Sequence, residues 1–248
     1  MKTEKTGASI QKKFDFSPPR PRPFLASLPA KIDTYEQGVA RLFQWRTGLD
    51  YYATIDQIVD FVVNTRRTKV VDLLGDTGTF ALRLAGRKAF FGRIHSFDSN
   101  ITLLERARQR ARHLNLGQVV EFEQFEEPGW PVPDCFAEIA VSIFDFHRHQ
   151  APRFLKEAFR ILASEGYLLL GEVIEAQPSF RTRLAQAWRK SHLRFVQRNP
   201  SEAEGVYYDQ EELIRMLLDT GFRQVVIQGL RSPSSRHQGV FSLVAATK

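Results

Sequence analysis

The stretch at residues 70–80, VVDLLGDTGTF, constrains the fold of this chain more than any other. Two valines run into Asp72, two leucines follow, and a loop with Gly75 and Gly78 precedes an apolar segment of helical character. A strand, a glycine loop and a helix in this order place a nucleotide-like ligand at the carboxyl edge of a parallel sheet. Glycine serves such a loop because the backbone turns sharply and approaches the ligand closely. The stretch therefore predicts a ligand-binding α/β fold.

A second signal is an acid at the end of the next predicted strand. Residues 92–100, GRIHSFDSN, read as a strand that ends in Asp98. A carboxylate at this position accepts hydrogen bonds from the hydroxyl groups of a ribose. The two signals in this order predict a Rossmann-like half-domain. A dehydrogenase is disfavoured, because the first loop does not follow the G-x-G-x-x-G pattern.

Apolar periodicity predicts the remaining elements. Helices are expected over 36–43, from about 50 to 64, and over 78–87, 101–114, 152–162 and 208–220; strands are expected over 69–74, 92–97, 119–125, 136–142, 167–174, 222–230 and 239–247. In the helix over 78–87, Arg83 is expected on the solvent-facing side. The helix over 101–114 should turn one stripe inward: Leu103, Leu104, Ala107 and Ala111.

Five segments, in order, follow the pattern of one family: DLLGDTG at 72–78, DSN at 98–100 with LERAR at 104–108, PVPD at 131–134, VSIFDFHR at 141–148 and RILASEGYL at 160–168. In these segments the chain resembles class I S-adenosylmethionine-dependent methyltransferases, in particular the small-molecule group that includes the ubiquinone/menaquinone-biosynthesis C-methyltransferases. The resemblance implies a Rossmann-like, three-layer α/β/α sandwich. Its seven-stranded, mostly parallel sheet would have the order 3-2-1-4-5-7-6, with strand 7 antiparallel.

The resemblance also implies S-adenosylmethionine as the cofactor and indicates the residues that hold it. Asp98 would bind the ribose, and Glu126, or else Glu127, would receive the adenine amino group. The other implied cofactor-binding positions come from the first loop and from the ends of the second and fourth strands: Asp72, Leu74, Gly75, Asp76, Thr77, Gly78, Ser99, Ser142 and Phe144.

Two positions in the first loop depart from the family pattern. Leu74 and Asp76 replace glycines, and only Gly78 is kept. Leu74 places a bulky side chain where the backbone otherwise lies against the cofactor. Asp76 adds an anion that repels the methionine carboxylate of the cofactor, or pairs with its ammonium group. Two functions therefore stay open: methyl transfer to a small, aromatic or lipophilic acceptor, or a catalytically degenerate binding or assembly subunit.

The loop after the fourth strand carries the candidate catalytic groups. Asp145 and His147 are the only nearby side chains in the sequence that are suited to proton transfer. A histidine in such a loop also has an ordinary structural interpretation. Arg148 stands where the family pattern has a second histidine.

Aromatic and acidic side chains from other segments are candidates for the pocket wall. Glu172, at the end of the fifth strand, is expected to contact the substrate or to pair with an arginine of the following segment. The N-terminal helices offer Trp45, Tyr51 and Tyr52, which either line the pocket or pack against the sheet. The residue types do not decide between these alternatives.

Charge divides the chain into a mildly acidic core and two basic segments. The net charge is +7, of which residues 1–23 carry +4 and residues 176–200 carry +6, so the rest carries −3. We expect a flexible, basic, proline-rich tail at 1–30 and a methyltransferase-like domain at 31–248, with N-terminal helices at 34–64 and a lid insertion at 176–207. Tail and lid are candidates for contact with a membrane surface or a protein partner. Nucleic acid is not an expected partner, because the chain has no (N/D)-P-P-(Y/F) motif and no RNA-binding module.

Composition sets expectations about compartment and metal content. No apolar run approaches the roughly 18 residues that a membrane span needs. Residues 1–13 have no apolar signal core, and Cys135 is the single cysteine. No cysteines and histidines are spaced as metal ligands. We therefore expect a cytoplasmic protein without a disulfide or a metal site.

Overall fold

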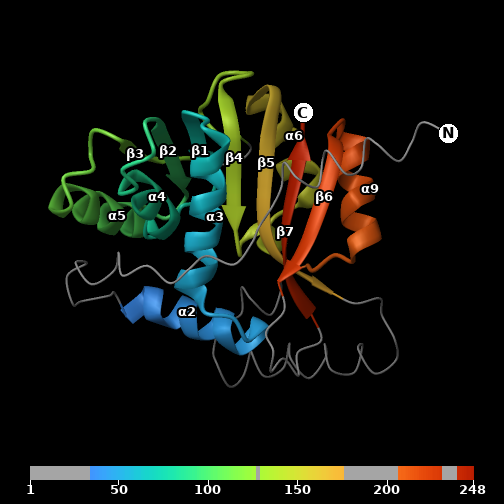
Figure 1. Cartoon of the computed structure of the whole chain (residues 1–248), viewed down its shortest axis with the longest axis horizontal. Helices are drawn as coiled ribbons and strands as arrows, with labels where there is room; N and C mark the ends of the chain where they lie inside the picture. The colour runs from blue at the N-terminus through green and yellow to red at the C-terminus, as the bar shows by residue number, and fades with distance from the viewer. Residues whose placement is uncertain (1–33, 127–128, 176–205, 231–238) are drawn as a thin grey trace.

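The computed structural model describes residues 34–126, 129–175, 206–230 and 239–248 (Figure 1). The basic tail predicted at 1–30 lies outside the described residues, as does the lid predicted at 176–207 apart from its last two residues. Within the described part of the chain, no helix is both long and apolar enough to cross a membrane.

Seven strands form one sheet in the predicted order, β3-β2-β1-β4-β5-β7-β6. Strands β1 to β5 run parallel to one another, and β7 is antiparallel to both β5 and β6. The carboxyl ends of β1, β2 and β4 meet at one edge, the lower edge in Figure 1. The strands are β1 (Lys69–Asp72), β2 (Arg93–Asp98), β3 (Val120–Gln124), β4 (Ala137–Ile143), β5 (Leu162–Glu175), β6 (Arg223–Leu230) and β7 (Gly239–Thr247).

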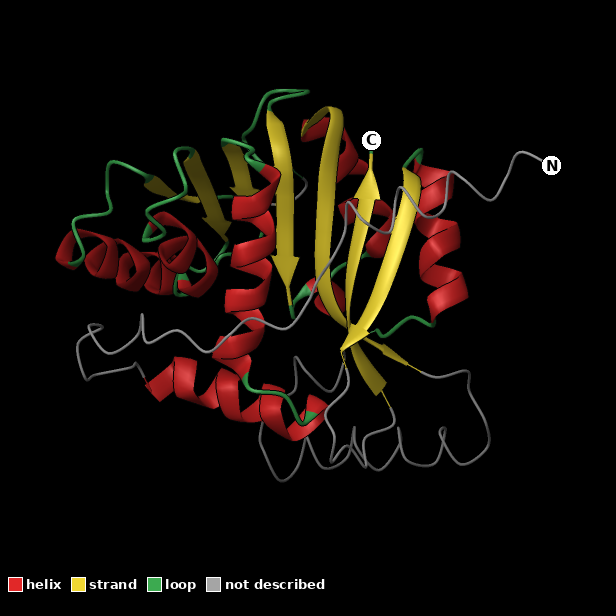
Figure 2. Ribbon diagram, in the orientation of Figure 1, coloured by secondary structure: helices red, strands yellow, loops and turns green. Residues whose placement is uncertain are grey.

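Helices cover both faces of the sheet and give the predicted three layers (Figure 2). One apolar cluster joins α3, α4 and α5 to the sheet, and a second cluster joins α6 and α9 to it. α2 lies across the carboxyl edge and buries Phe43 in the first cluster. The helices are α2 (Thr34–Thr47), α3 (Tyr51–Thr65), α4 (Thr79–Ala85), α5 (Ile101–His113), the short 3-10 helix η2 (Phe146–Arg148), α6 (Ala151–Ile161) and α9 (Gln210–Thr220).

The element boundaries follow local signals, with two extensions. α3 begins after Asp50, whose carboxylate accepts a hydrogen bond from the backbone N–H of Ala53 at 2.7 Å and so caps the helix. α2 continues to Thr47, and β5 begins at Leu162, earlier than predicted. α5 buries the predicted stripe: Leu103, Leu104, Ala107 and Ala111.

The prediction that Arg83 faces solvent is wrong. The side chain of Arg83 is only 3% exposed, and its guanidinium lies 2.8 Å from Asp56 of α3. Arg87 contacts the other oxygen of the same carboxylate at 2.9 Å. All seven residues of α4 are buried, because α3 packs over the helix. A helix of two turns is too short for its apolar periodicity to show that Arg83 is buried. The ion-pair partner, Asp56, lies on another helix, so the local sequence does not reveal it either.

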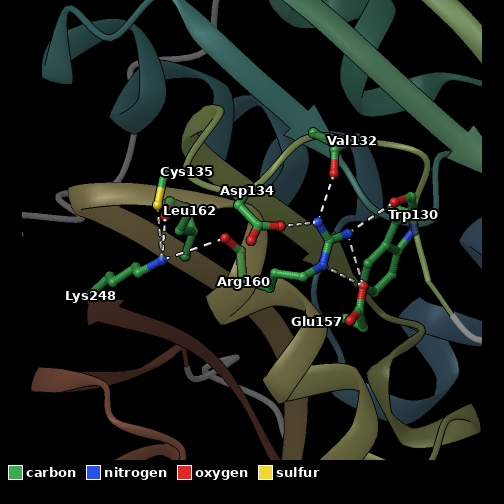
Figure 3. Close-up of polar contacts among 8 residues, drawn as sticks. All are labelled: Trp130, Val132, Asp134, Cys135, Glu157, Arg160, Leu162 and Lys248. Atoms are coloured by element: carbon green, nitrogen blue, oxygen red, sulfur yellow. Dashed lines mark hydrogen bonds and ion pairs between the residues drawn. The ribbon is translucent and has the colours of Figure 1, made fainter.

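Arg160 of α6 holds the connection between β3 and β4 in place (Figure 3). Its guanidinium donates to the carbonyls of Val132 and Trp130 at 2.8 and 3.1 Å, and to the carboxylate of Asp134 at 2.7 Å. The indole N–H of Trp130 in turn donates to the carbonyl of Leu73 at 2.9 Å. Arg160 therefore supports, through Trp130, the chain segment that leads from β1 into the glycine loop.

We expect Arg160→Met to lower the free energy of unfolding by roughly 1–3 kcal/mol, because it leaves two carbonyls and the carboxylates of Asp134 and Glu157 without their donor. Denaturant unfolding of both proteins measures the difference. Arg153→Met is the matched control, because Arg153 is an exposed arginine of the same helix. If both variants lower the free energy of unfolding by the same amount, the contacts of Arg160 contribute nothing to stability beyond helix propensity.

Candidate active site

A cavity of about 300 Å³ opens at the carboxyl edge of the sheet, beside the ends of β1, β2 and β4. Helices α2, α3, α4 and α5 complete its wall. Eight of the predicted cofactor-binding and catalytic residues line this cavity: Asp72, Leu74, Gly75, Asp76, Asp98, Ser99, Phe144 and Asp145. The two sequence signals, the glycine loop and the acid after the second strand, therefore meet in one place.

Two glycines give the first loop its close packing. At Gly75 a Cβ atom would lie 1.9 Å from Ser96 Oγ, so only glycine lets the loop rest against β2. Gly78 has φ +77°, and a Cβ there would lie 2.8 Å from the ring of Phe122. A side chain at either position would displace the loop from the sheet.

Asp76 keeps the loop conformation that a glycine would otherwise supply. Its φ is 51°, in the left-handed region that aspartate and asparagine tolerate better than most residues. Its backbone N–H donates to Asp98 Oδ2 at 3.0 Å. Leu74 borders the cavity, but it is only 8% exposed and packs in the core cluster beneath α6. The altered motif therefore still forms an ordered loop against Asp98.

The carboxylate of Asp98 joins two loops. Oδ2 accepts from the backbone N–H of Asp76, and Oδ1 accepts from that of Asn100 at 2.7 Å. The first donor belongs to the glycine loop and the second caps α5. Two backbone amides hold this carboxylate in place beside the cavity.

Asp72 is buried at the base of the cavity and is 2% exposed. Burial raises the pKa of its carboxyl group to about 7, and the nearby charges of Asp98 and Asp145 act in the same direction. The hydroxyl of Ser96 donates to Asp72 Oδ2 at 3.1 Å and opposes the shift in pKa. Near neutral pH this carboxyl is therefore close to the midpoint of its titration.

A partly buried ion pair connects α2 to the glycine loop. Arg110 of α5 donates to the carbonyl of Thr77 at 2.9 Å and to Glu36 Oε2 at 2.7 Å. Glu36 is 4% exposed, whereas the side chain of Arg110 is 26% exposed, so water reaches the contact only from the arginine side. The ion pair holds the start of α2 over the cavity, where Tyr35 and Val39 form part of the wall.

His147 lies behind the cavity rather than in its wall. Its side chain is fully buried, and its Nδ1 is 2.9 Å from Glu172 Oε2, which also accepts the backbone N–H of His147 at 3.2 Å. The imidazole stacks on the ring of Tyr207 at 4.6 Å between centroids. Burial by itself would raise the pKa of Glu172. The charge and the hydrogen bond of His147 outweigh this effect and hold the pKa of Glu172 below its usual range. Glu172 thus pairs with this histidine among the described residues.

Asp145 is the predicted proton-transfer group that does line the cavity. It follows Phe144, which takes the left-handed conformation at φ 60°. The backbone N–H of Phe144 donates to the carbonyl of Gly171 at 2.6 Å, and its ring packs on Phe43. These contacts hold an unfavourable backbone conformation, as often occurs where a loop must present a side chain to a site.

Several predicted residues do not line the cavity. Thr77 and Ser142 are buried, Gly78 packs on Phe122, and Glu126 is exposed outside the cavity. Ser142 Oγ has no hydrogen-bond partner among the described residues. Of the aromatic wall candidates, Tyr51 lines the cavity, whereas Trp45 and Tyr52 do not.

The cavity has further lining residues that the sequence did not single out. They are Tyr35, Val39, Ile55, Thr79, Phe80, Asn100, Leu103, Ile143 and His149. Asn100 and Leu103 follow Asp98 directly, so the position of the strand end could have indicated them. Tyr35 and Val39 depend on how α2 crosses the edge of the sheet, which no local pattern encodes.

The pKa of Asp72 predicts a pH-dependent free energy of unfolding. Because the folded state raises this pKa, Asp72 favours folding most below about pH 4, and this contribution is lost as the pH rises to about 7. Asp72→Asn removes the titration. As the pH rises from about 4 to about 8, the free energy of unfolding of the variant should therefore increase relative to that of the parent protein, by on the order of 4 kcal/mol.

Denaturant unfolding of both proteins across this pH range measures the gain. Asp219→Asn, at an exposed position of α9, is the matched control. A difference between Asp72→Asn and the parent protein that stays constant with pH, or that the control reproduces, would contradict the prediction.

Comparison with known proteins identifies the family. A family model described as a methyltransferase domain matches residues 44–227. The ubiquinone/menaquinone biosynthesis C-methyltransferase of Neisseria meningitidis is 28% identical over 182 residues, which are 66% of this chain and 72% of the relative.

Solved structures share the fold. A SAM-dependent methyltransferase of Thermotoga maritima, described as a possible histamine N-methyltransferase, is 23% identical and aligns with a TM-score of 0.59 over 86% of this chain and 95% of that one. A second structure is that of geranyl diphosphate C-methyltransferase of Streptomyces coelicolor in complex with Mg²⁺, geranyl diphosphate and S-adenosyl-L-homocysteine. It is 12% identical and aligns with a TM-score of 0.62 over 90% of this chain and 87% of that one. The chain belongs to the class I S-adenosylmethionine-dependent methyltransferase family.

Proposed function

We propose that this protein transfers a methyl group from S-adenosylmethionine to a small acceptor bound at the carboxyl edge of the sheet. The observation that carries the proposal is the junction of the glycine loop with Asp98. The N–H of Asp76 binds the Asp98 carboxylate at 3.0 Å, and both residues line the cavity. This junction holds despite the two substitutions in the first loop.

The residues of the cavity fit the cofactor. Asp98 offers a carboxylate, the group that suits ribose hydroxyls, and Leu103 adds an apolar surface to the same cavity. Gly75 and Asp76 line the cavity, and the loop backbone there would contact the methionine group of the cofactor. When bound, the cofactor supplies an electrophilic methyl group on a sulfonium.

The chain itself contributes mainly positioning. Tyr35 and Val39 of α2 cover the cavity, and the contact between Arg110 and Glu36 keeps that helix in place. Asp145 is placed to accept a proton from an acceptor group. His147 supports the same segment from behind through its bond with Glu172.

The wall of the cavity favours an aromatic or lipophilic acceptor. Tyr35, Tyr51, Phe80 and Phe144 all line it. Such rings offer flat apolar surfaces on which an aromatic acceptor can stack. The Neisseria relative is named as a C-methyltransferase of ubiquinone and menaquinone biosynthesis.

Calorimetric titration with S-adenosylmethionine and S-adenosylhomocysteine tests the proposal. We expect micromolar binding, because the loop and Asp98 are already ordered against each other. Lack of binding at millimolar concentrations of both ligands would reject methyl transfer and favour the alternative, a binding or assembly protein on a methyltransferase fold.

Asp98→Ala should weaken cofactor binding about tenfold or more, on the order of 1.4 kcal/mol, because the ribose loses its acceptor and the glycine loop loses its anchor. Asp219→Ala, on the exposed side of α9, controls for a general effect of removing a carboxylate. Unchanged affinity in Asp98→Ala, measured by the same titration, would remove Asp98 from the binding site.

A further inference from the structure

A histidine and two glutamates meet on two neighbouring strands, outside the cavity of the candidate active site. His95 lies on β2, and Glu121 and Glu123 lie on β3, the strand that ends the sheet (Figure 1). Each side chain brings one ligand atom, and the three atoms lie within 4.8 Å of one another. Imidazole nitrogen and carboxylate oxygen both bind metal ions, so this group is a candidate cation site.

The pairing of the two strands brings these side chains together. His95 is the direct partner of Glu121 in the parallel register. Glu123 lies two residues after Glu121 and therefore shares its face of the sheet, because side chains alternate along a strand. Phe122, between them, turns to the opposite face and packs in the first apolar cluster. The fold of β2 and β3 thus places both carboxylates beside one imidazole ring.

Both carboxylates approach the same nitrogen of that ring. His95 Nδ1 lies 3.4 Å from Glu123 Oε1 and 3.8 Å from Glu121 Oε2. A single ring nitrogen carries one hydrogen or one lone pair, so it serves only one carboxylate through a hydrogen bond. A metal ion bound to that lone pair can coordinate both carboxylates at once. The convergence on Nδ1 therefore suits a bound ion better than a hydrogen-bonded pair.

The distances suit a small tetrahedral ion. Zinc bonds to nitrogen and oxygen of about 2.0–2.1 Å place neighbouring ligand atoms about 3.4 Å apart. The two distances at Nδ1 are close to this value. The ring of Phe136 packs edge-to-face on His95, at 5.3 Å between centroids, and so orients the imidazole. The side chain of Glu121 is 68% exposed, which leaves room for its carboxylate to rotate and for water to complete the coordination.

We propose that His95, Glu121 and Glu123 bind a divalent transition-metal ion such as zinc, and that this ion fastens β3 to β2. The inference does not rest on the proposed function, since none of the three residues lines the active-site cavity. β3 pairs with β2 alone, so a metal bridge adds a second link at the end of the sheet. No spacing pattern in the sequence indicates this site, because its ligands lie on two separate strands.

Calorimetric titration of the full-length protein with zinc chloride, after dialysis against a chelator, tests the proposal. We expect micromolar zinc binding and no comparable binding of magnesium, because imidazole suits transition metals and magnesium favours oxygen ligands. Zinc should also raise the temperature of thermal unfolding, because an ion that binds the folded state stabilises it.

His95→Asn and Glu123→Gln should each weaken zinc binding by about a hundredfold. Each removes a ligand, and even the loss of a group that only orients a ligand costs about 10–100-fold in metal affinity. Both variants should also lose the rise in unfolding temperature with zinc. His113→Asn and Glu105→Gln, at exposed positions of α5, are the matched controls. Circular dichroism shows that each variant is folded.

The outcomes separate a metal site from its alternatives. Zinc binding that both variants weaken and both controls leave intact supports the proposal. Absence of zinc binding at millimolar concentration overturns it and makes the group an ion pair alone. Zinc binding that neither variant weakens also overturns it, because the ion then binds elsewhere on the chain. Magnesium binding that depends on Glu123 but not on His95 overturns it as well and indicates an acidic surface that attracts hard cations.

Discussion

The site depends on one carboxylate that accepts two backbone amides. Asp98 receives the N–H of Asp76 from the glycine loop and the N–H of Asn100 from the start of α5. Hydrogen bonds to an ionised acceptor are among the stronger ones in proteins. Since the two donors belong to segments that follow different strands, this carboxylate fixes β1 and β2 relative to each other where a ligand must bind. The loop keeps its shape with aspartate at a glycine position because this contact supports it.

Basic and acidic side chains occupy different places around the cavity. Basic side chains near the site are engaged elsewhere: Arg110 binds Glu36 and the carbonyl of Thr77, and Arg83 binds Asp56. Four aspartates, by contrast, line the cavity: Asp72, Asp76, Asp98 and Asp145. The structure therefore concentrates negative potential where a sulfonium cofactor is proposed to bind. An apo protein with such a site is less stable than its packing would allow, as is common at binding sites.

The resemblance of five ordered segments to one family predicted the sheet order, and two short strand patterns predicted the main acids of the site. Asp72 and Asp98 are recognisable as the residues that end two apolar strands. The surroundings of His147 were not predictable in this way. Its partners Glu172 and Tyr207 come from distant segments, and only the folded chain brings them together. The burial of Arg83 and the crossing of α2 over the cavity likewise depend on packing between helices, for which local periodicity carries no information.

The position of β7 has a consequence for how the protein is made. β7 is the last strand along the chain, yet it lies inside the sheet between β5 and β6 and pairs with β5 from Tyr167↔Thr247 to Glu175↔Gly239. Synthesis begins at the N-terminus. The edge of β5 that pairs with β7 therefore stays unpaired until the ribosome has made residues 239–247. An unpaired apolar strand of this kind invites association with other chains. Nascent copies of this protein should therefore depend on chaperones until translation has passed the last strand.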